Sequence, residues 1–315
     1  MAKNGKSTSA QSHDWPNSPV LPRDPDAHYG KGHKRAIVIS GGGLAGLAFG
    51  AAYLRGLEEA GVDLRGADLV VGTSAGSILG TEIQSGHLKR FTAQIQLAAK
   101  TRLFERIRHD ADPEPSAAHA RALFDDNADG DIESLRRIGH AALAAKAPSQ
   151  LSLVAQVGAF VRRISWPSPG LRTTACDAYT GERLVFSSQS KVPLLLALSA
   201  SSSVPGLMSP VRIGNRRCVD GGMGSGVNAD IAAGAEKALV IGLVHDPTQG
   251  KWTNRPNQWV DELSYLTNAG TEIESRVPAE DLGDPMDATA LPLGLRLGAE
   301  QAAADAADLA GFWKA

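Results

Sequence analysis

The sequence lacks the features that mark several specialised classes of protein. Its 315 residues include only two cysteines, Cys176 and Cys218, which are too few for a disulfide framework and form no CxxC pair. No apolar run reaches the roughly 18 residues that a membrane-spanning helix needs. No apolar stretch follows the N-terminal lysines, and Ala2 stands where N-myristoylation requires a glycine. We therefore expect a cytoplasmic protein, and peripheral contact with a membrane is left open.

Charge of one sign and aromatic side chains are also scarce. The formal net charge is −2 and aromatic residues make up 5% of the chain, so the sequence does not indicate a surface for binding nucleic acid. The spacing of the histidines does not suggest a metal site. The composition that remains, with 43% hydrophobic and 21% charged residues, is typical of a globular protein. We expect no nucleic acid partner and no bound metal.

The first 33 residues differ from the rest of the chain in composition and in apolar periodicity. They are rich in polar residues, glycine and proline, and they show almost no apolar periodicity. Such a segment buries too little apolar surface to offset the entropy lost on ordering. We expect a disordered tail over residues 1–33 and one folded domain over residues 34–315.

From residue 34 onward the sequence predicts strands that alternate with helices. The runs AIVI at 36–39 and ADLVV at 67–71 are short, continuous and apolar, and glycines follow closely, as is typical of buried parallel strands. Helical character follows each run, over 44–60 and 77–84. This order of elements predicts an α/β fold with a mainly parallel central sheet.

The middle of the chain has a different pattern. Residues from about 87 to 165 carry no clear strand signal, and they place alanine, leucine, arginine and glutamate at helical spacing, which predicts a helical insertion. After the insertion we expect a helix over 191–200, mostly helix beyond residue 244, and strands over 171–178, 183–186, 211–213, 217–219 and 237–244.

The strongest local signal for chemistry is the GxSxG sequence Gly72-Thr73-Ser74-Ala75-Gly76. It follows a predicted buried strand and precedes a predicted helix, which is the context in which such a serine sits on a tight turn and acts as a nucleophile. The N-terminus of the following helix favours negative charge that develops beside Ser74. The alternative interpretation is a turn of small residues that a serine caps.

Three consecutive glycines, Gly41, Gly42 and Gly43, follow the first predicted strand. One interpretation is an oxyanion hole, because such a turn presents backbone N–H groups to a tetrahedral intermediate. The span 41–46 also fits the GxGxxG pattern of a dinucleotide-binding turn, but that reading expects an acidic residue after the second strand, where this chain has Gly72-Thr73-Ser74. A plain tight turn is the third interpretation.

The third signal is Asp220-Gly221-Gly222, late in the chain. Aspartate followed by glycine is most often a turn, because both residues suit the backbone angles that turns require. Taken alone, this motif does not indicate catalysis.

Together the three motifs, in this order, resemble the patatin-like phospholipase family. The stretches CDAYTGERLVFSS, ALSASSSVPGLMSPV and RRCVDGGM resemble the family's approach to its DGG motif, and the resemblance covers roughly residues 34–245. It implies a patatin-like three-layer fold and hydrolysis of acyl esters of lipids or phospholipids without a cofactor.

The resemblance also implies a role for each motif. Ser74 would be the nucleophile and Asp220 the base of a Ser–Asp dyad, and Gly41, Gly42 and Gly43 would form the oxyanion hole. The glycines that would support these motifs are Gly46, Gly72, Gly76, Gly221 and Gly222.

One position departs from the family pattern. The family usually has arginine or lysine two residues after the glycine triplet, and this chain has Ala45. A cation at that position could stabilise an oxyanion or bind a lipid phosphate. Its absence favours a neutral lipid or a short acyl ester as the substrate.

Two rival interpretations stay open on the sequence. His245 follows the last predicted strand, so a Ser74–Asp220–His245 triad of the α/β-hydrolase type is formally available. A lone histidine at a strand end is more often structural or solvated. The second rival is a non-catalytic module that binds a nucleotide or a lipid through the turn at 41–46.

Overall fold

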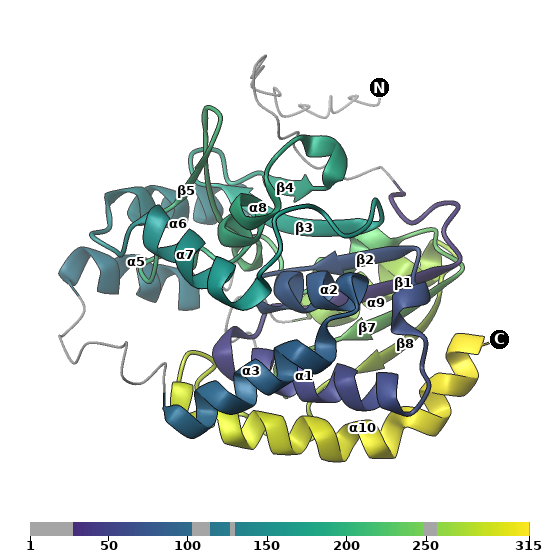
Figure 1. Ribbon diagram of the computed structural model, residues 1–315. Helices are drawn as coiled ribbons and strands as arrows, with labels where there is room; N and C mark the ends of the chain where they lie inside the picture. Colours follow the sequence, from purple (N-terminus) through teal and green to yellow (C-terminus); the bar gives the residue numbers. More distant parts are fainter. Residues whose placement is uncertain (1–27, 103–113, 127–129, 249–256, 315) are drawn as a thin grey trace, which may run out of the picture.

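The computed structural model describes residues 28–102, 114–126, 130–248 and 257–314. They form an α/β domain around one eight-stranded sheet (Figure 1). In chain order the strands are β1 (Arg35–Ile39), β2 (Leu69–Gly72), β3 (Leu171–Asp177), β4 (Arg183–Phe186), β5 (Val211–Ile213), β6 (Arg216–Asp220), β7 (Lys237–Ile241) and β8 (Glu272–Arg276).

The sheet order is β5-β6-β3-β2-β1-β7-β8, with β4 paired to β3. Five neighbouring strands of the sheet run parallel to one another, in the order β3, β2, β1, β7 and β8. The strands β4, β5 and β6 join the sheet through antiparallel pairs. The strands β1 and β2 are adjacent, so the turns that follow them lie side by side. This agrees with the rule that ligand sites of such sheets form beyond the carboxyl ends of the parallel strands.

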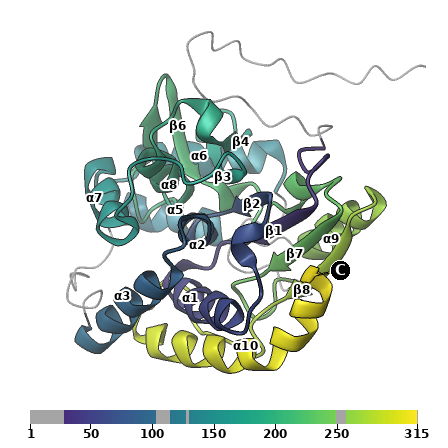
Figure 2. The ribbon, with the colours of Figure 1, turned by 45° about the vertical axis from the view of Figure 1, so that its right-hand side comes forward.

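Helices cover both faces of the sheet, as Figures 1 and 2 show. Alternate residues of β1 enter different cores. Ile37 and Ile39 join the larger core, and Ala36 and Val38 join the smaller one. In chain order the helices are α1 (Gly43–Glu59), α2 (Ala75–Ser85), α3 (Leu88–Thr101), α5 (Pro115–Asp125), α6 (Ile132–Ala144), α7 (Gln150–Val161), α8 (Leu194–Ser201), α9 (Gln258–Asn268) and α10 (Leu291–Lys314).

The helix α1, which begins at the glycine triplet, is fixed by close packing against α10. A Cβ atom at Gly298 would lie 2.3 Å from the carbonyl oxygen of Phe49, and one at Gly294 would lie 2.7 Å from the carbonyl oxygen of Ala45. Only glycine permits this approach of the two backbones. The long helix along the lower edge of Figure 1 therefore supports the element that carries the first motif.

The helical insertion predicted over 87–165 is present. In its described part it consists of α3, α5, α6 and α7 and contains no strand. The helices α5, α6 and α7 gather at one side of the molecule in Figure 1, away from the C-terminus. The predicted α/β class with a mainly parallel central sheet is confirmed.

Some boundaries differ from the sequence predictions. The strand predicted to reach residue 244 ends at Ile241, and residues 272–276, which we expected to be helical, form the edge strand β8. Residues 28–33, included in the predicted tail, lie against the domain, where the Gly30 N–H donates to the Ala233 carbonyl at 3.0 Å. The rest of the predicted tail, residues 1–27, lies outside the described residues.

Among the helices that the structure describes, none combines the length and the apolar composition required to cross a bilayer.

Candidate active site

Ser74 occupies a strained backbone conformation at the turn between β2 and α2. Its φ and ψ angles are 52° and −119°, which a non-glycine residue rarely adopts. Its N–H donates to the Ser201 hydroxyl oxygen at 2.9 Å, so α8 helps to hold the turn. Strained angles at a residue directly before a helix are the geometry expected of a nucleophile on a strand–turn–helix motif.

The flanking glycines make this turn possible. A Cβ atom at Gly72 would lie 2.4 Å from the carbonyl oxygen of Gly76, and one at Gly76 would lie 2.1 Å from the carbonyl oxygen of Ile39. A larger residue at Gly72 would push β2 away from α2, and one at Gly76 would push α2 away from β1. These glycines therefore support Ser74 sterically, as predicted from the GxSxG pattern.

Asp220 lies at the end of β6 and is almost completely buried, with 2% of its surface exposed. Its Oδ1 accepts a hydrogen bond from the Gly222 N–H at 2.8 Å, whereas its buried Oδ2 has no hydrogen-bond partner in the described structure. Burial raises the pKa of Asp220 to about 7, and the neighbouring Ser74 side chain, the Gly222 amide and the charge of Arg121 oppose this rise. A carboxylate with such a pKa and a vacant oxygen can accept a proton near neutral pH.

The glycine turn offers fewer hydrogen-bond donors than we expected. The Gly41 N–H already donates to the Gly226 carbonyl at 2.8 Å, so it is not available to an oxyanion. In the described part of the chain, the N–H groups of Gly42 and Gly43 have no acceptor, and neither does that of Ala75, which begins α2. Of the three glycines predicted to form an oxyanion hole, Gly42 and Gly43 have N–H groups that could serve as donors, whereas Gly41 ties the turn to the loop that follows Asp220.

Both remaining donors must be glycine for steric reasons. A Cβ atom at Gly42 would lie 2.4 Å from the Cβ atom of Leu243. Gly43 has a φ of +59°, and a Cβ atom there would lie 2.4 Å from the carbonyl oxygen of Pro285. Two of the predicted supporting glycines are equally confined: a Cβ atom at Gly46 would meet Leu243, and one at Gly221 would meet Thr174.

The three motifs converge on one small cavity of about 40 Å³. Gly41, Gly42, Gly43, Ser74 and Asp220 all line it. The Ser74 side chain lies close enough to Asp220 to lower its pKa by hydrogen bonding, although no contact of the Asp220 Oδ2 atom meets the usual hydrogen-bond geometry. The structure thus brings the predicted site residues together from turns that lie far apart in the sequence.

A cation from the helical insertion also borders this cavity. Arg121 on α5 lines the cavity with Ser74 and Asp220, and its Nε donates to both carboxylate oxygens of Asp125, at 2.8 and 2.7 Å. The positive charge of Arg121 lowers the pKa of Asp220. A basic group is therefore present in the site although position 45 is alanine.

A second, apolar cavity of about 150 Å³ adjoins Ser74. Its walls are mainly apolar side chains of α1, α2, α7 and the segment after α8. The lining residues include Leu47, Ile78, Val157, Phe160 and Met208. A pocket of this composition next to a candidate nucleophile suits an acyl chain.

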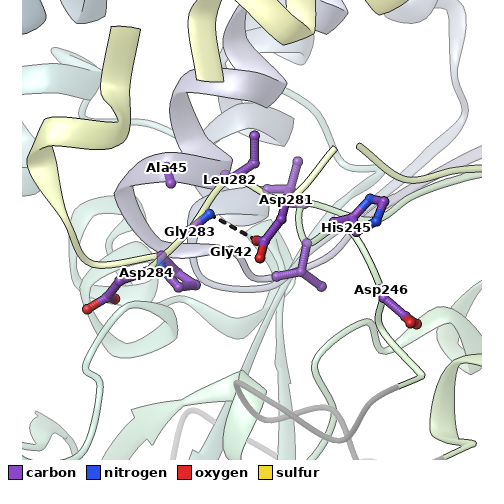
Figure 3. Close-up of a pocket in the computed structure, with 12 residues that line it drawn as sticks. Gly42, Ala45, His245, Asp246, Asp281, Leu282, Gly283 and Asp284 are labelled. Carbon is purple, nitrogen blue, oxygen red and sulfur yellow. Dashed lines mark hydrogen bonds between the residues drawn. The ribbon is translucent and has the colours of Figure 1, made fainter. Parts of the chain in front are cut away.

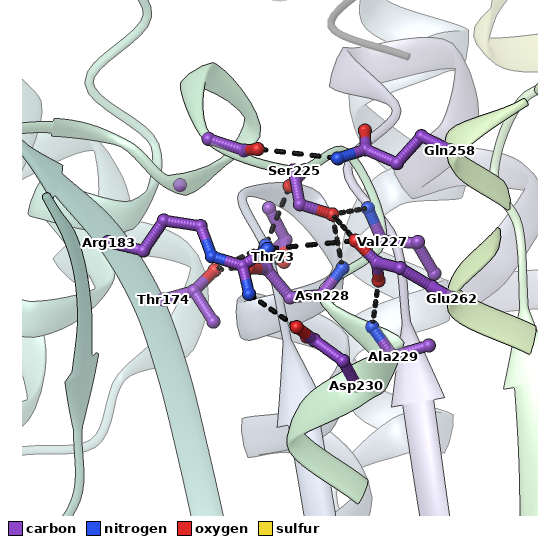
Figure 4. A network of polar contacts seen from close by, with 12 residues as sticks. Thr73, Thr174, Arg183, Ser225, Val227, Asn228, Ala229, Asp230, Gln258 and Glu262 are labelled. Carbon is purple, nitrogen blue, oxygen red and sulfur yellow. Dashed lines mark hydrogen bonds and ion pairs between the residues drawn. The ribbon is translucent and has the colours of Figure 1, made fainter. Parts of the chain in front are cut away.

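A buried polar network fixes the loop that follows Asp220 (Figure 4). The Asn228 side-chain amide donates to the Thr73 hydroxyl at 3.0 Å, directly beside Ser74. Glu262 of α9 accepts from the Ser225 hydroxyl and from the Ala229 N–H, each at 2.6 Å. The network therefore connects the GxSxG turn to the segment after the DGG motif.

The same network concentrates buried charge. Burial and the neighbouring Asp230 carboxylate raise the pKa of Glu262 to about 7, and Arg183 opposes this rise. Arg183 also pairs with Asp230 at 2.6 Å. Removing one member would leave an uncompensated buried charge, so these residues hold the loop as a unit.

His245 lies elsewhere. It lines a separate cavity of about 290 Å³, shown in Figure 3, which neither Ser74 nor Asp220 borders. Its Nδ1 contacts the Pro278 carbonyl oxygen at 2.7 Å. This arrangement does not support a Ser74–Asp220–His245 triad. Within the described ranges, no cluster of histidine, cysteine, aspartate or glutamate could hold a metal ion.

Sequence reasoning missed several residues of the site. Ser201 lies in a stretch that resembles the family, yet nothing in the pattern indicated its bond to Ser74. Arg121 and Met286 line the cavity from distant segments, and Glu262 belongs to a helix without any motif. The sequence could not indicate that the Gly41 N–H is already hydrogen-bonded, because its acceptor, the Gly226 carbonyl, lies far away in the chain.

Comparisons with known proteins agree with the motifs. A family model described as patatin-like phospholipase matches residues 37–233, which is more than half of the chain. Among solved structures, the type III effector protein ExoU is similar, with 16% sequence identity and a TM-score of 0.39. That likeness covers 92% of this chain and 55% of the ExoU chain. The search of curated proteins gave no match.

The raised pKa of Asp220 predicts how stability depends on pH. Between its ordinary value near 4 and about 7, the folded protein holds a proton that the unfolded chain releases, so the folded state loses stability as pH rises through this window. We expect the unfolding free energy of wild type, relative to Asp220→Asn, to fall by about 2–3 kcal/mol between pH 5 and pH 8 in urea titrations.

Asp308→Asn, which replaces an exposed aspartate of α10, is the control and should leave the pH dependence of wild type unchanged. A constant difference between wild type and Asp220→Asn at both pH values would contradict the assigned environment of Asp220.

Proposed function

Because the chain belongs to the patatin-like phospholipase family, we propose that it hydrolyses acyl esters of lipids with Ser74 as nucleophile and Asp220 as base. The observation that carries the proposal is the cavity that Ser74, Asp220, Gly42 and Gly43 share. It combines a hydroxyl on a strained turn, a buried carboxylate and two N–H groups without acceptors.

The first half of the proposed reaction forms an acyl-enzyme. Asp220 takes the proton of the Ser74 hydroxyl as Oγ attacks the ester carbonyl carbon. The N–H groups of Gly42 and Gly43 stabilise the negative charge on the carbonyl oxygen, and the Ala75 N–H at the start of α2 is a further candidate donor. The C–O bond to the alcohol then breaks, and Asp220 passes its proton to the departing oxygen.

The second half returns the enzyme to its starting state. Asp220 takes a proton from a water molecule, whose oxygen attacks the acyl carbon bound to Ser74. The acid leaves, and the proton returns to Ser74 Oγ. A pKa near 7 suits Asp220 for both roles, since the group must accept and release a proton in each half of the cycle.

The apolar cavity beside Ser74 supports a lipid substrate rather than a polar ester. Its walls include Leu47, Ile78 and Phe160, so an acyl chain placed there would leave its carboxyl end near Ser74. The helix α7 supplies one of these walls, which gives the helical insertion a direct part in binding the substrate.

Arg121 bears on the choice between neutral lipids and phospholipids. From Ala45 alone we expected a neutral substrate, but Arg121 brings a guanidinium group into the same cavity as Ser74. Guanidinium groups bind phosphate through charge-assisted hydrogen bonds. The amended proposal is that Arg121 contacts the phosphate of a phospholipid substrate.

The dyad is tested by the hydrolysis of p-nitrophenyl butyrate. Replacing the nucleophile or the base removes a step that each acyl transfer needs, so Ser74→Ala and Asp220→Asn should lose roughly 10³-fold or more of the wild-type rate. His245→Ala should keep a near-normal rate, because His245 borders a different cavity. Circular dichroism spectra establish that each variant is folded. A folded but inactive His245→Ala variant would indicate a triad instead.

The role of Arg121 is tested by comparing phosphatidylcholine with a monoacylglycerol of the same acyl chain. Arg121→Gln removes one charge-assisted contact, so kcat/KM for phosphatidylcholine should fall about tenfold more than kcat/KM for the monoacylglycerol. Arg296→Gln is the matched control. Arg296 also pairs with a carboxylate four residues later, but on α10 and away from the cavity. Equal losses on both substrates would exclude phosphate recognition by Arg121.

A further inference from the structure

The helix α7 is a surface helix without a single charged residue. Its sequence is QLSLVAQVGAFV, and Figure 2 shows it at the outer edge of the molecule. Leu153, Val157 and Phe160 line the apolar cavity beside Ser74. The opposite face is exposed and carries Leu151, of which 78% is exposed, together with small residues. A solvent-facing helix normally carries charged residues on that face.

The segment that follows α7 continues the exposed apolar surface. Ile164 is 84% exposed, the largest fraction among the exposed large apolar residues that the structure describes. Arg162 and Arg163 precede it directly. Exposed apolar side chains beside arginines are the combination that binds the boundary between lipid headgroups and acyl chains.

The sequence segment that contains α7 carries charge of one sign. Between Glu133 and Asp177 the sequence contains no acidic residue and six basic ones, although the whole chain has 34 acidic and 32 basic residues. The six are Arg136, Arg137, Lys146, Arg162, Arg163 and Arg172. Arg136 and Lys146 pair with Glu133 and Glu114, which precede the segment. The attraction to an anionic surface is therefore assigned to Arg162 and Arg163, which directly follow α7.

We infer that the outer face of α7, with Leu151 and with Ile164 just beyond the helix, docks on a bilayer that contains anionic lipids. The apolar side chains would enter the headgroup region while the arginines contact the negative headgroups. That the occupant is a lipid surface rather than a protein rests in part on the proposed function. The inner face of α7 forms the wall of the acyl cavity, so docking here would bring that cavity next to its lipid.

The inference is tested by co-sedimentation of the full-length chain with vesicles, in the Ser74→Ala background so that no lipid is consumed. The probes are phosphatidylcholine vesicles with and without roughly one third phosphatidylglycerol. We expect binding to the anionic vesicles, and about tenfold weaker binding after Leu151→Ser combined with Ile164→Ser. The matched control is Val260→Ser, which replaces an exposed apolar residue of α9 and should bind like its parent.

Hydrolysis of a soluble ester separates docking from catalysis. With Ser74 intact, the double variant should hydrolyse p-nitrophenyl butyrate at the wild-type rate, because neither Leu151 nor Ile164 lines the cavities at Ser74. Equal vesicle binding by the double variant and the control would overturn the inference, as would failure of the parent to bind anionic vesicles. If wild type bound vesicles as expected but hydrolysed no ester, the docking surface would stand and the proposed function would fall.

Discussion

The strained turn at Ser74 is the constraint on which the rest of the site depends. A serine with a φ of 52° and a ψ of −119° needs support from its surroundings, because those angles are unfavourable on their own. Gly72 and Gly76 allow β1, β2 and α2 to come close enough to provide it, and the Ser201 hydroxyl accepts a hydrogen bond from the buried Ser74 N–H. These contacts hold the serine at one position relative to the neighbouring strand ends, which is the preorganisation that the proposed acyl transfer would need.

The loop after Asp220 links the turn at Ser74 to the glycine triplet and to the DGG motif. The Gly226 carbonyl accepts from the Gly41 N–H, and the Asn228 amide donates to Thr73, so one loop touches both turns. Glu262 fixes the loop from α9, outside the segment that matches the family model. The geometry of the site is thus a property of the whole domain, although its chemistry is confined to a few residues.

Much of the site could be predicted from the sequence because the backbone geometry of each motif depends on residues that are neighbours in the chain. Consecutive glycines and a serine between glycines leave a pattern that reports backbone geometry directly, and the continuous apolar runs of β1 and β2 report burial. Interactions between distant segments leave no such pattern. Arg121 looks like any helical arginine, the engagement of the Gly41 N–H depends on Gly226, and the edge strand β8 has the sequence EIESR with a single apolar residue.

In the proposed reaction, Ser74 forms a covalent acyl intermediate with the help of Asp220. The most direct measurement is labelling with a fluorophosphonate, which reacts with activated serines, followed by peptide mass spectrometry. We expect a single adduct on the peptide that contains Ser74, no adduct in Ser74→Ala, and much slower labelling in Asp220→Asn. An adduct on another residue, or a folded wild-type protein that is not labelled, would contradict the proposed reaction.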